Sequence, residues 1–231
     1  MAGCRRCAGP SGCEERSGAA REVVSRALAW LYPTRRWGEP DDERRHGAGV
    51  CAHDGEALAA ELAGALAAST WFVPGGEDEY CDYVYVQCVG REPNLIQIRT
   101  GAAPIPAELD GGPIDELYLR LCLSAMARLA VVQQVAVEGR WRDGELHVTE
   151  RPRPGVYDPP LLPRLQRLVA TLPAYDITHL DFGALSAPPA GFDPGDYAAR
   201  YGGAPAAVNY LFYPQPSGTV VSCEVPAAVS R

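Results

Sequence analysis

The hydrophobic pattern is most continuous over residues 113–132, PIDELYLRLCLSAMARLAVV. Apolar residues recur there at helical spacing, and Pro113 suits a first helical position because its missing N–H costs nothing. The remaining polar residues form a narrow stripe stepped every four positions: Glu116, Arg120, Ser124 and Arg128. The pattern therefore predicts a central core helix that a sheet and other helices cover on most sides.

Shorter patterns predict the remaining elements. Apolar residues that recur every three or four positions predict helices at 21–32, 54–66, 158–172 and 193–201. Runs rich in β-branched and aromatic residues predict strands at 80–89, 94–100, 135–141, 145–150, 175–182, 208–213 and 219–225. Asp143-Gly144 predicts a two-residue hairpin turn between two of these strands.

These elements predict an α+β fold, in which an antiparallel sheet packs in two layers on the central apolar helix, with a C-terminal α/β extension. We expect residues 1–50 to form a flexible N-terminal arm with one short amphipathic helix. Residues 51–173 then form the core domain, and residues 174–231 an extension packed on it. The element order over 54–172 is similar to that of type III secretion chaperone-like folds, which act as dimers that hold other proteins. No motif specific to that family accompanies it.

Composition indicates the class of protein. Of the 231 residues, 47% are hydrophobic and 22% charged, as in ordinary globular proteins. No apolar run has the length of a membrane span, and the first residues lack the apolar core of a signal peptide, so a soluble cytoplasmic protein is expected. All 21 basic residues are arginine, which is typical of a GC-rich genome.

Charge is distributed unevenly along the chain. Residues 1–45 carry a net charge of +2, whereas the remainder carries −10. An acidic body without a basic stripe cannot neutralise phosphates, which argues against nucleic-acid binding. The same charge disfavours an anionic membrane surface.

The eight cysteines are expected to be mostly reduced thiols that act as small apolar residues. Cys4 and Cys7, with Cys13 after them, have half the spacing of a zinc knuckle, and Cys51 and His53 could complete a site only by closing a long loop. Acylation of Cys4 is a further alternative. The sequence therefore predicts no metal and no cofactor.

A small enzyme is the alternative hypothesis for function. His179 and Asp181 share a strand face and could orient a base, but they need a metal or a nucleophile such as Cys81. His147 alternates with apolar neighbours and falls on the wet side of its strand. Cys122 lies among leucines, where burial makes a thiol inert. No phosphate-cradling loop, dinucleotide fingerprint or hydrolase motif is present.

A tyrosine-rich strand supplies the leading hypothesis. Tyr83, Tyr85 and Gln87 share one face of the strand at 80–89, while apolar residues suffice for the other face. The tyrosine face can be half-buried sheet surface, or it can be covered by the hairpin at 208–225. The sharper interpretation is a non-enzymatic protein-binding module, an adaptor or chaperone-like protein, because tyrosine is enriched at interfaces. Another protein or a second copy of the chain would then bind at Tyr80, Tyr83, Tyr85 and Gln87.

Overall fold

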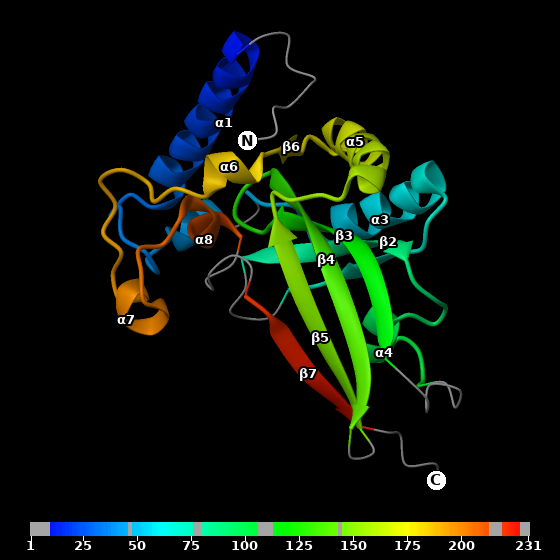
Figure 1. Cartoon of the computed structure of the whole chain (residues 1–231). Helices are drawn as coiled ribbons and strands as arrows, with labels where there is room; N and C mark the ends of the chain where they lie inside the picture. The colour runs from blue at the N-terminus through cyan, green and yellow to red at the C-terminus, as the bar shows by residue number, and fades with distance from the viewer. Residues whose placement is uncertain are drawn as a thin grey trace.

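The computed structural model describes residues 10–45, 48–75, 80–105, 113–142, 145–212 and 219–226. Within these residues, seven strands form one sheet (Figure 1). They are β1 (Thr70–Val73), β2 (Cys81–Val89), β3 (Ile114–Ser124), β4 (Leu129–Arg142), β5 (Glu145–Pro154), β6 (Thr178–His179) and β7 (Val221–Pro226). The order β1-β2-β3-β4-β5-β7 is antiparallel throughout, and β6 pairs in parallel with β4. The predicted α+β class is confirmed.

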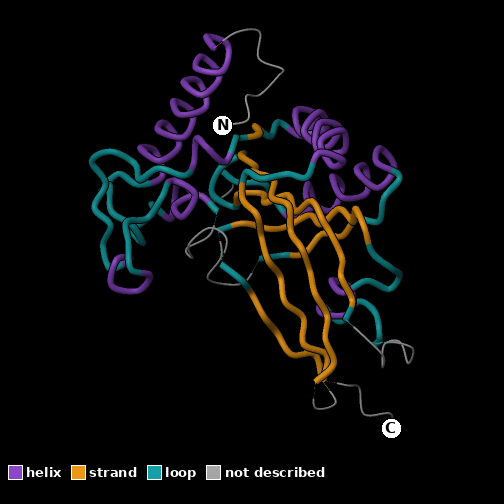
Figure 2. Tube along the Cα trace, in the orientation of Figure 1, coloured by secondary structure: helices purple, strands orange, loops and turns teal. Residues whose placement is uncertain are grey.

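Helices cover both faces of this sheet. The helices of the described residues are α1 (Pro10–Leu31), α2 (Asp42–Arg45), α3 (Ala52–Leu66), α4 (Leu95–Arg99), α5 (Leu162–Thr171), α6 (Phe182–Leu185), α7 (Tyr197–Tyr201) and α8 (Ala207–Leu211). One buried cluster joins α3 and α5 to the sheet, and the other joins α1, α4, α6 and α8 to its opposite face. The expectation of two layers is therefore wrong, because the sheet lies between two helical layers. The far ends of β4, β5 and β7 extend beyond the upper helices (Figure 2).

The predicted central helix at 113–132 is instead β3, a turn and the start of β4. Leu119 and Leu121 face the cluster beneath α3 and α5, while Tyr118 and Cys122 face the opposite cluster. A strand that is covered on both faces has no polar alternation, so it reads as a continuous apolar run. The leucines that favoured a helix are thus the two buried faces of an inner strand.

Two predicted strands are short helices. Residues 94–100 hold α4 and its two caps. The Asn94 side chain accepts from the Gln97 N–H at 2.9 Å, and the Gln97 side chain accepts from the Asn94 N–H at 3.1 Å, which favours the start of a helix. Over 208–212 the backbone forms α8 and its end, and residue 213 lies outside the described residues. The predicted strand at 175–182 keeps two strand residues, in β6. The element order that resembled chaperone-like folds is therefore not the observed one.

Other sequence predictions find counterparts. The hairpin at 135–150 is β4 and β5, with Arg142 opposite Glu145, and its Asp143-Gly144 turn lies outside the described residues. The helices expected at 54–66 and 158–172 correspond to α3 and α5. The division into arm, core and extension stays a prediction. Burial of Val24, Leu28 and other apolar residues of α1 nevertheless places this helix in the main core.

Candidate functional site

The two central tyrosines of the predicted binding face, Tyr83 and Tyr85, are inside the protein. Tyr83 is 9% exposed and Tyr85 is 1% exposed, so their face is covered within the chain itself. Tyr80 and Gln87 are half-buried, and the Gln87 amide donates to the Arg91 carbonyl at 3.0 Å. A second helical layer, which the two-layer expectation did not include, lies over this face. Partner binding by these four residues stays a prediction, and a partner would reach Tyr85 only after the fold opened.

Tyr85 belongs to a buried ionic network instead. The Arg120 guanidinium contacts the Glu150 carboxylate at 3.0 Å and the Gln133 side-chain oxygen at 2.7 Å. Arg99, from α4, makes a second ion pair with Glu150. The Tyr85 hydroxyl donates to Glu150 at 3.2 Å, and burial raises the pKa of Tyr85 to about 12, so it stays protonated. Two arginines thus share one carboxylate in a network that joins five elements, β2, β3, β4, β5 and α4, which indicates a structural role.

Glu116 is a second buried carboxylate, and it lies on the same face of β3 as Arg120. It is 3% exposed; one oxygen accepts from the Leu95 N–H at 2.9 Å and from the Tyr118 hydroxyl. The other oxygen has no hydrogen-bond partner among the described residues. Burial raises the pKa of Glu116, because a charged carboxylate loses hydration there.

The Glu116→Gln variant is expected to reveal this shift as a pH dependence. A carboxyl whose pKa is higher in the folded state favours folding below its unfolded pKa and loses that contribution as the pH rises through the folded value. Wild-type stability should therefore fall relative to Glu116→Gln as the pH rises from about 4 to about 8. Urea unfolding across this range measures the difference, with exposed Glu56→Gln as the control. A stability difference independent of pH would contradict the shift.

The residues of the enzyme hypothesis are not brought together. His179 lies opposite Ala130 of β4, whereas Cys81 lies opposite Ser124 of β3. Three strand spacings therefore separate the His179 and Cys81 backbones, on the order of 14 Å. Burial lowers the pKa of His179, and the nearby Asp181 charge partly opposes this. Catalysis by His179 and Asp181 stays a prediction.

The structure does not test the cysteine candidates for zinc. Cys4 and Cys7 lie outside the described residues, as does the side chain of Cys13, while Cys51 and His53 are exposed at the start of α3. Across the described part of the chain, no three His, Cys, Asp or Glu side chains are placed to hold a metal ion. In the same residues, no helix is both long and apolar enough to cross a membrane.

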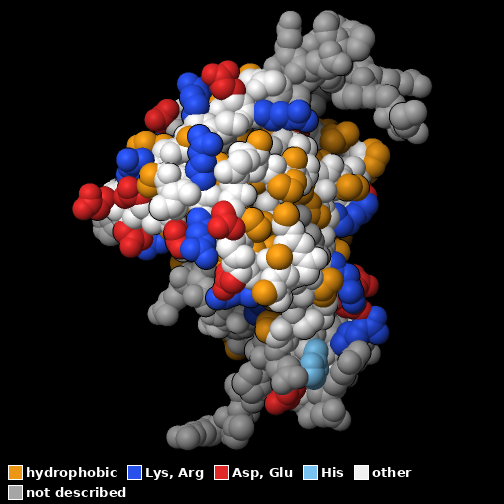
Figure 3. All heavy atoms as spheres, turned by 90° about the vertical axis from the view of Figure 1, so that its left-hand side faces the viewer, with side chains coloured by type: hydrophobic (Ala, Val, Ile, Leu, Met, Phe, Trp, Pro, Cys, Tyr) orange, Lys and Arg blue, Asp and Glu red, His pale blue; other side chains and the backbone are white. Residues whose placement is uncertain are grey.

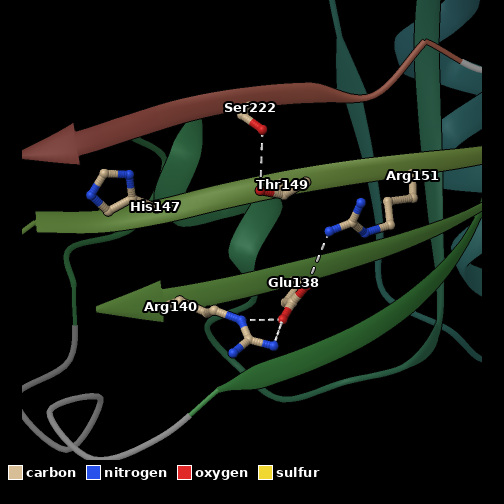
Figure 4. A pocket seen from close by; sticks show the side chains of 6 residues that line it. All are labelled: Glu138, Arg140, His147, Thr149, Arg151 and Ser222. Carbon is tan, nitrogen blue, oxygen red and sulfur yellow. Dashed lines mark hydrogen bonds and ion pairs between the residues drawn. The ribbon is translucent and has the colours of Figure 1, made fainter. Parts of the chain in front are cut away.

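A polar cavity of about 410 Å³ lies on the projecting ends of β4, β5 and β7 (Figure 4). Six side chains from these strands line it: Glu138, Arg140, His147, Thr149, Arg151 and Ser222. Glu138 pairs with Arg140 and, at 3.5 Å, with Arg151; the hydrogen bond from Arg140 lowers the pKa of Glu138. Thr149 and Ser222 share a hydrogen bond of 3.2 Å. The charged groups in this cavity therefore largely satisfy one another.

A larger cavity, about 560 Å³, lies between α1 and the segment that runs from α6 to α8. We call it the α1 groove. Apolar side chains form its walls: Val24, Leu28 and Ala29 from α1, and Ala184, Ala187, Pro188, Pro189, Ala190, Phe192 and Ala207 from the opposite segment. Its polar lining consists of Arg21, Ser25 and Arg35. Figure 3 shows this side of the molecule, with hydrophobic side chains gathered in its middle and charged ones around them.

Aromatic packing holds the two walls together. The Tyr32 ring, at the end of α1, meets the Tyr210 ring edge-on at a centroid distance of 5.1 Å, and its hydroxyl donates to the Tyr210 carbonyl at 2.8 Å. Phe192 packs against Tyr210 at 5.4 Å. The Asp193 N–H donates to the Arg35 carbonyl at 2.8 Å, and the Trp37 N–H donates to the Asp193 carbonyl at 3.0 Å. Ring contacts and backbone hydrogen bonds therefore hold the two walls of the groove in fixed relative positions.

Sequence reasoning missed the α1 groove. One wall lies in the predicted flexible arm and the other in the predicted extension, more than 150 positions away along the chain. A signal was present in the apolar spacing of Val24, Leu28 and Leu31, which indicates a helix that packs on something. Comparison with protein-family models, with curated proteins and with solved structures found no match.

Proposed function

We propose that the protein is a non-enzymatic binding module, of the adaptor or chaperone-like kind, that holds a segment of another protein in the α1 groove. The groove carries this proposal because it joins a volume of about 560 Å³ to walls that are mostly apolar. Ligand sites in proteins typically have this size and character, with a few polar groups that fix orientation. In this proposal the α1 groove, and not the buried Tyr83 and Tyr85, is the recognition surface.

The exposure of the groove walls supports binding of a chain segment. Ala29, Ala187 and Pro188 are exposed, while Val24 and Leu28 beneath them are buried, so the groove opens to solvent above an apolar floor. A helix flanks it on one side, as in proteins that receive apolar side chains of a partner segment in a groove. Removing those side chains from water supplies the binding free energy.

Selection from a random peptide library on the full-length chain tests this proposal. Ala187→Trp places a large ring in the groove from an exposed position, and should weaken the selected peptides at least tenfold. Ala170→Trp, the same change at an exposed residue of α5, is the matched control and should bind as wild type does. Both surface variants should keep their unfolding free energy within roughly 0.5 kcal/mol.

Two results would count against the proposal. One is a library without any peptide whose binding depends on Ala187. The other is a groove-dependent dimer of the chain in sedimentation equilibrium, which would make a second copy the occupant. The expected result is a monomer whose groove residues gain hydrogen-exchange protection when a selected peptide binds.

A further inference from the structure

We infer that the α1 groove selects segments that carry carboxylates beside their apolar residues, an inference that rests on the proposed binding function. Arg21 and Arg35 line the groove, and no acidic residue does. Neither arginine makes an ion pair with a carboxylate in the described part of the chain. Two cationic groups thus border an apolar cavity, in a chain whose net charge is −8.

Acidic residues that neighbour these arginines in the sequence or in the fold already have other partners. Glu22 pairs with Arg26 at 3.9 Å. Asp193 contacts Arg36 at 3.6 Å and accepts from the Gly195 N–H at 2.9 Å. Local pairing therefore takes up these carboxylates and leaves Arg21 and Arg35 for a charge that comes from outside.

The backbone holds Arg35 in place at the groove. Its φ of 54° lies in the left-handed region, which favours glycine or asparagine over arginine. Its N–H donates to the Tyr32 carbonyl at 2.9 Å, and its carbonyl accepts from Asp193. A β-carbon at Gly191 would lie 3.5 Å from the Arg35 guanidinium, so Arg35 reaches across to the opposite wall. This backbone conformation and the two hydrogen bonds fix the place from which the Arg35 side chain leaves the turn.

Arg21 approaches the groove from the other direction. It lies three residues before Val24 and four before Ser25, so the three side chains share one face of α1. The two arginines come from separate positions along the groove, one on the helix and one in the turn after it. A segment that contacts both needs two carboxylates beside its apolar residues.

The charge preference predicts a measurable coupling. Partly exposed arginine–carboxylate contacts are individually weak, so two of them together should change affinity by about tenfold. The attraction should also weaken as salt is raised from about 0.01 M to about 1 M, because mobile ions screen it. An apolar contact alone would lack this salt dependence.

A double-mutant cycle with the peptides selected through the groove tests the inference. One axis replaces each Asp and Glu of a groove-dependent peptide by Asn and Gln. The other compares wild type with the double variant Arg21→Gln/Arg35→Gln. Arg167→Gln is the control, because Arg167 is exposed on α5, outside the groove. We expect an excess of acidic residues in the selected peptides, a loss of about tenfold from either change, and little further loss from both together.

The outcomes separate the inference from the proposed function. If groove-dependent peptides lack an excess of acidic residues and bind the double variant as tightly as wild type, the inference fails while the binding function stands. If no selected peptide depends on Ala187, both fail. Circular dichroism of the double variant verifies that it is folded, which both arginines allow because they are exposed.

Discussion

Replacing Glu150 by glutamine is expected to lower the free energy of unfolding by about 3–5 kcal/mol, a large share of the total stability of an ordinary domain. The Glu150 side chain is 2% exposed, and it neutralises both Arg120, which is 10% exposed, and Arg99, which is 19% exposed. Glutamine keeps the shape but removes the charge, so two guanidinium groups remain in a nearly dry site. An uncompensated buried charge is far more costly than a missing surface ion pair.

Urea unfolding followed by circular dichroism measures this effect. Glu145→Gln, on the same strand β5, is the matched control and should change stability by less than about 1 kcal/mol. Adding Arg120→Met to Glu150→Gln should restore part of the loss, because it removes one of the stranded charges. A loss below about 1 kcal/mol, or strictly additive costs, would show that solvent reaches the network and that its charges are not buried.

How far an element is exposed to solvent decides whether the sequence indicates it. Elements with one wet face, such as α3 and α5, show the expected spacing of leucines, and β5 alternates buried and half-buried residues. The inner strand β3 has two buried faces, so its apolar residues follow no single period. Arg120 fits a helical polar stripe in the sequence, but in the fold it is buried against Glu150. Glu150 lies 30 positions away, so the local pattern does not reveal this pairing.

The candidate site could not be predicted for a related reason. The α1 groove forms where two distant segments meet, and neither segment has an unusual composition by itself. The tyrosine strand illustrates the opposite case, because its aromatic face suits a binding surface by composition, whereas a second helical layer covers it in the fold. Arg120 and Arg99 of α4 contact the Tyr85 hydroxyl. The sequence pattern predicts a helix around Arg120 and a strand around Arg99, so it does not predict these contacts. Period and composition describe one element at a time, whereas both features depend on pairing between elements.

The Leu28→Asp variant is expected to prevent cooperative folding, an effect above about 4 kcal/mol, because it places a carboxylate without a partner in the main core. Leu28 is 1% exposed and belongs to the same buried cluster as Tyr32 and Tyr210. Leu28→Ala, which leaves a cavity but no charge, should cost about 2–5 kcal/mol. Thermal melting by circular dichroism measures both variants, and Ala19→Asp, on the exposed face of α1, is the control.

Limited proteolysis gives an independent test, because the sequence predicts a flexible arm over residues 1–50 and the structure packs α1 into the core. If α1 is part of the folded unit, trypsin should not release a stable body that lacks residues 24–37 before the whole chain unfolds. If a trimmed body starts near residue 50 and melts at the same temperature as the full chain, the prediction of a flexible arm is correct. It would also remove one wall of the α1 groove, and every peptide selected through Ala187 should then lose its binding to the trimmed body.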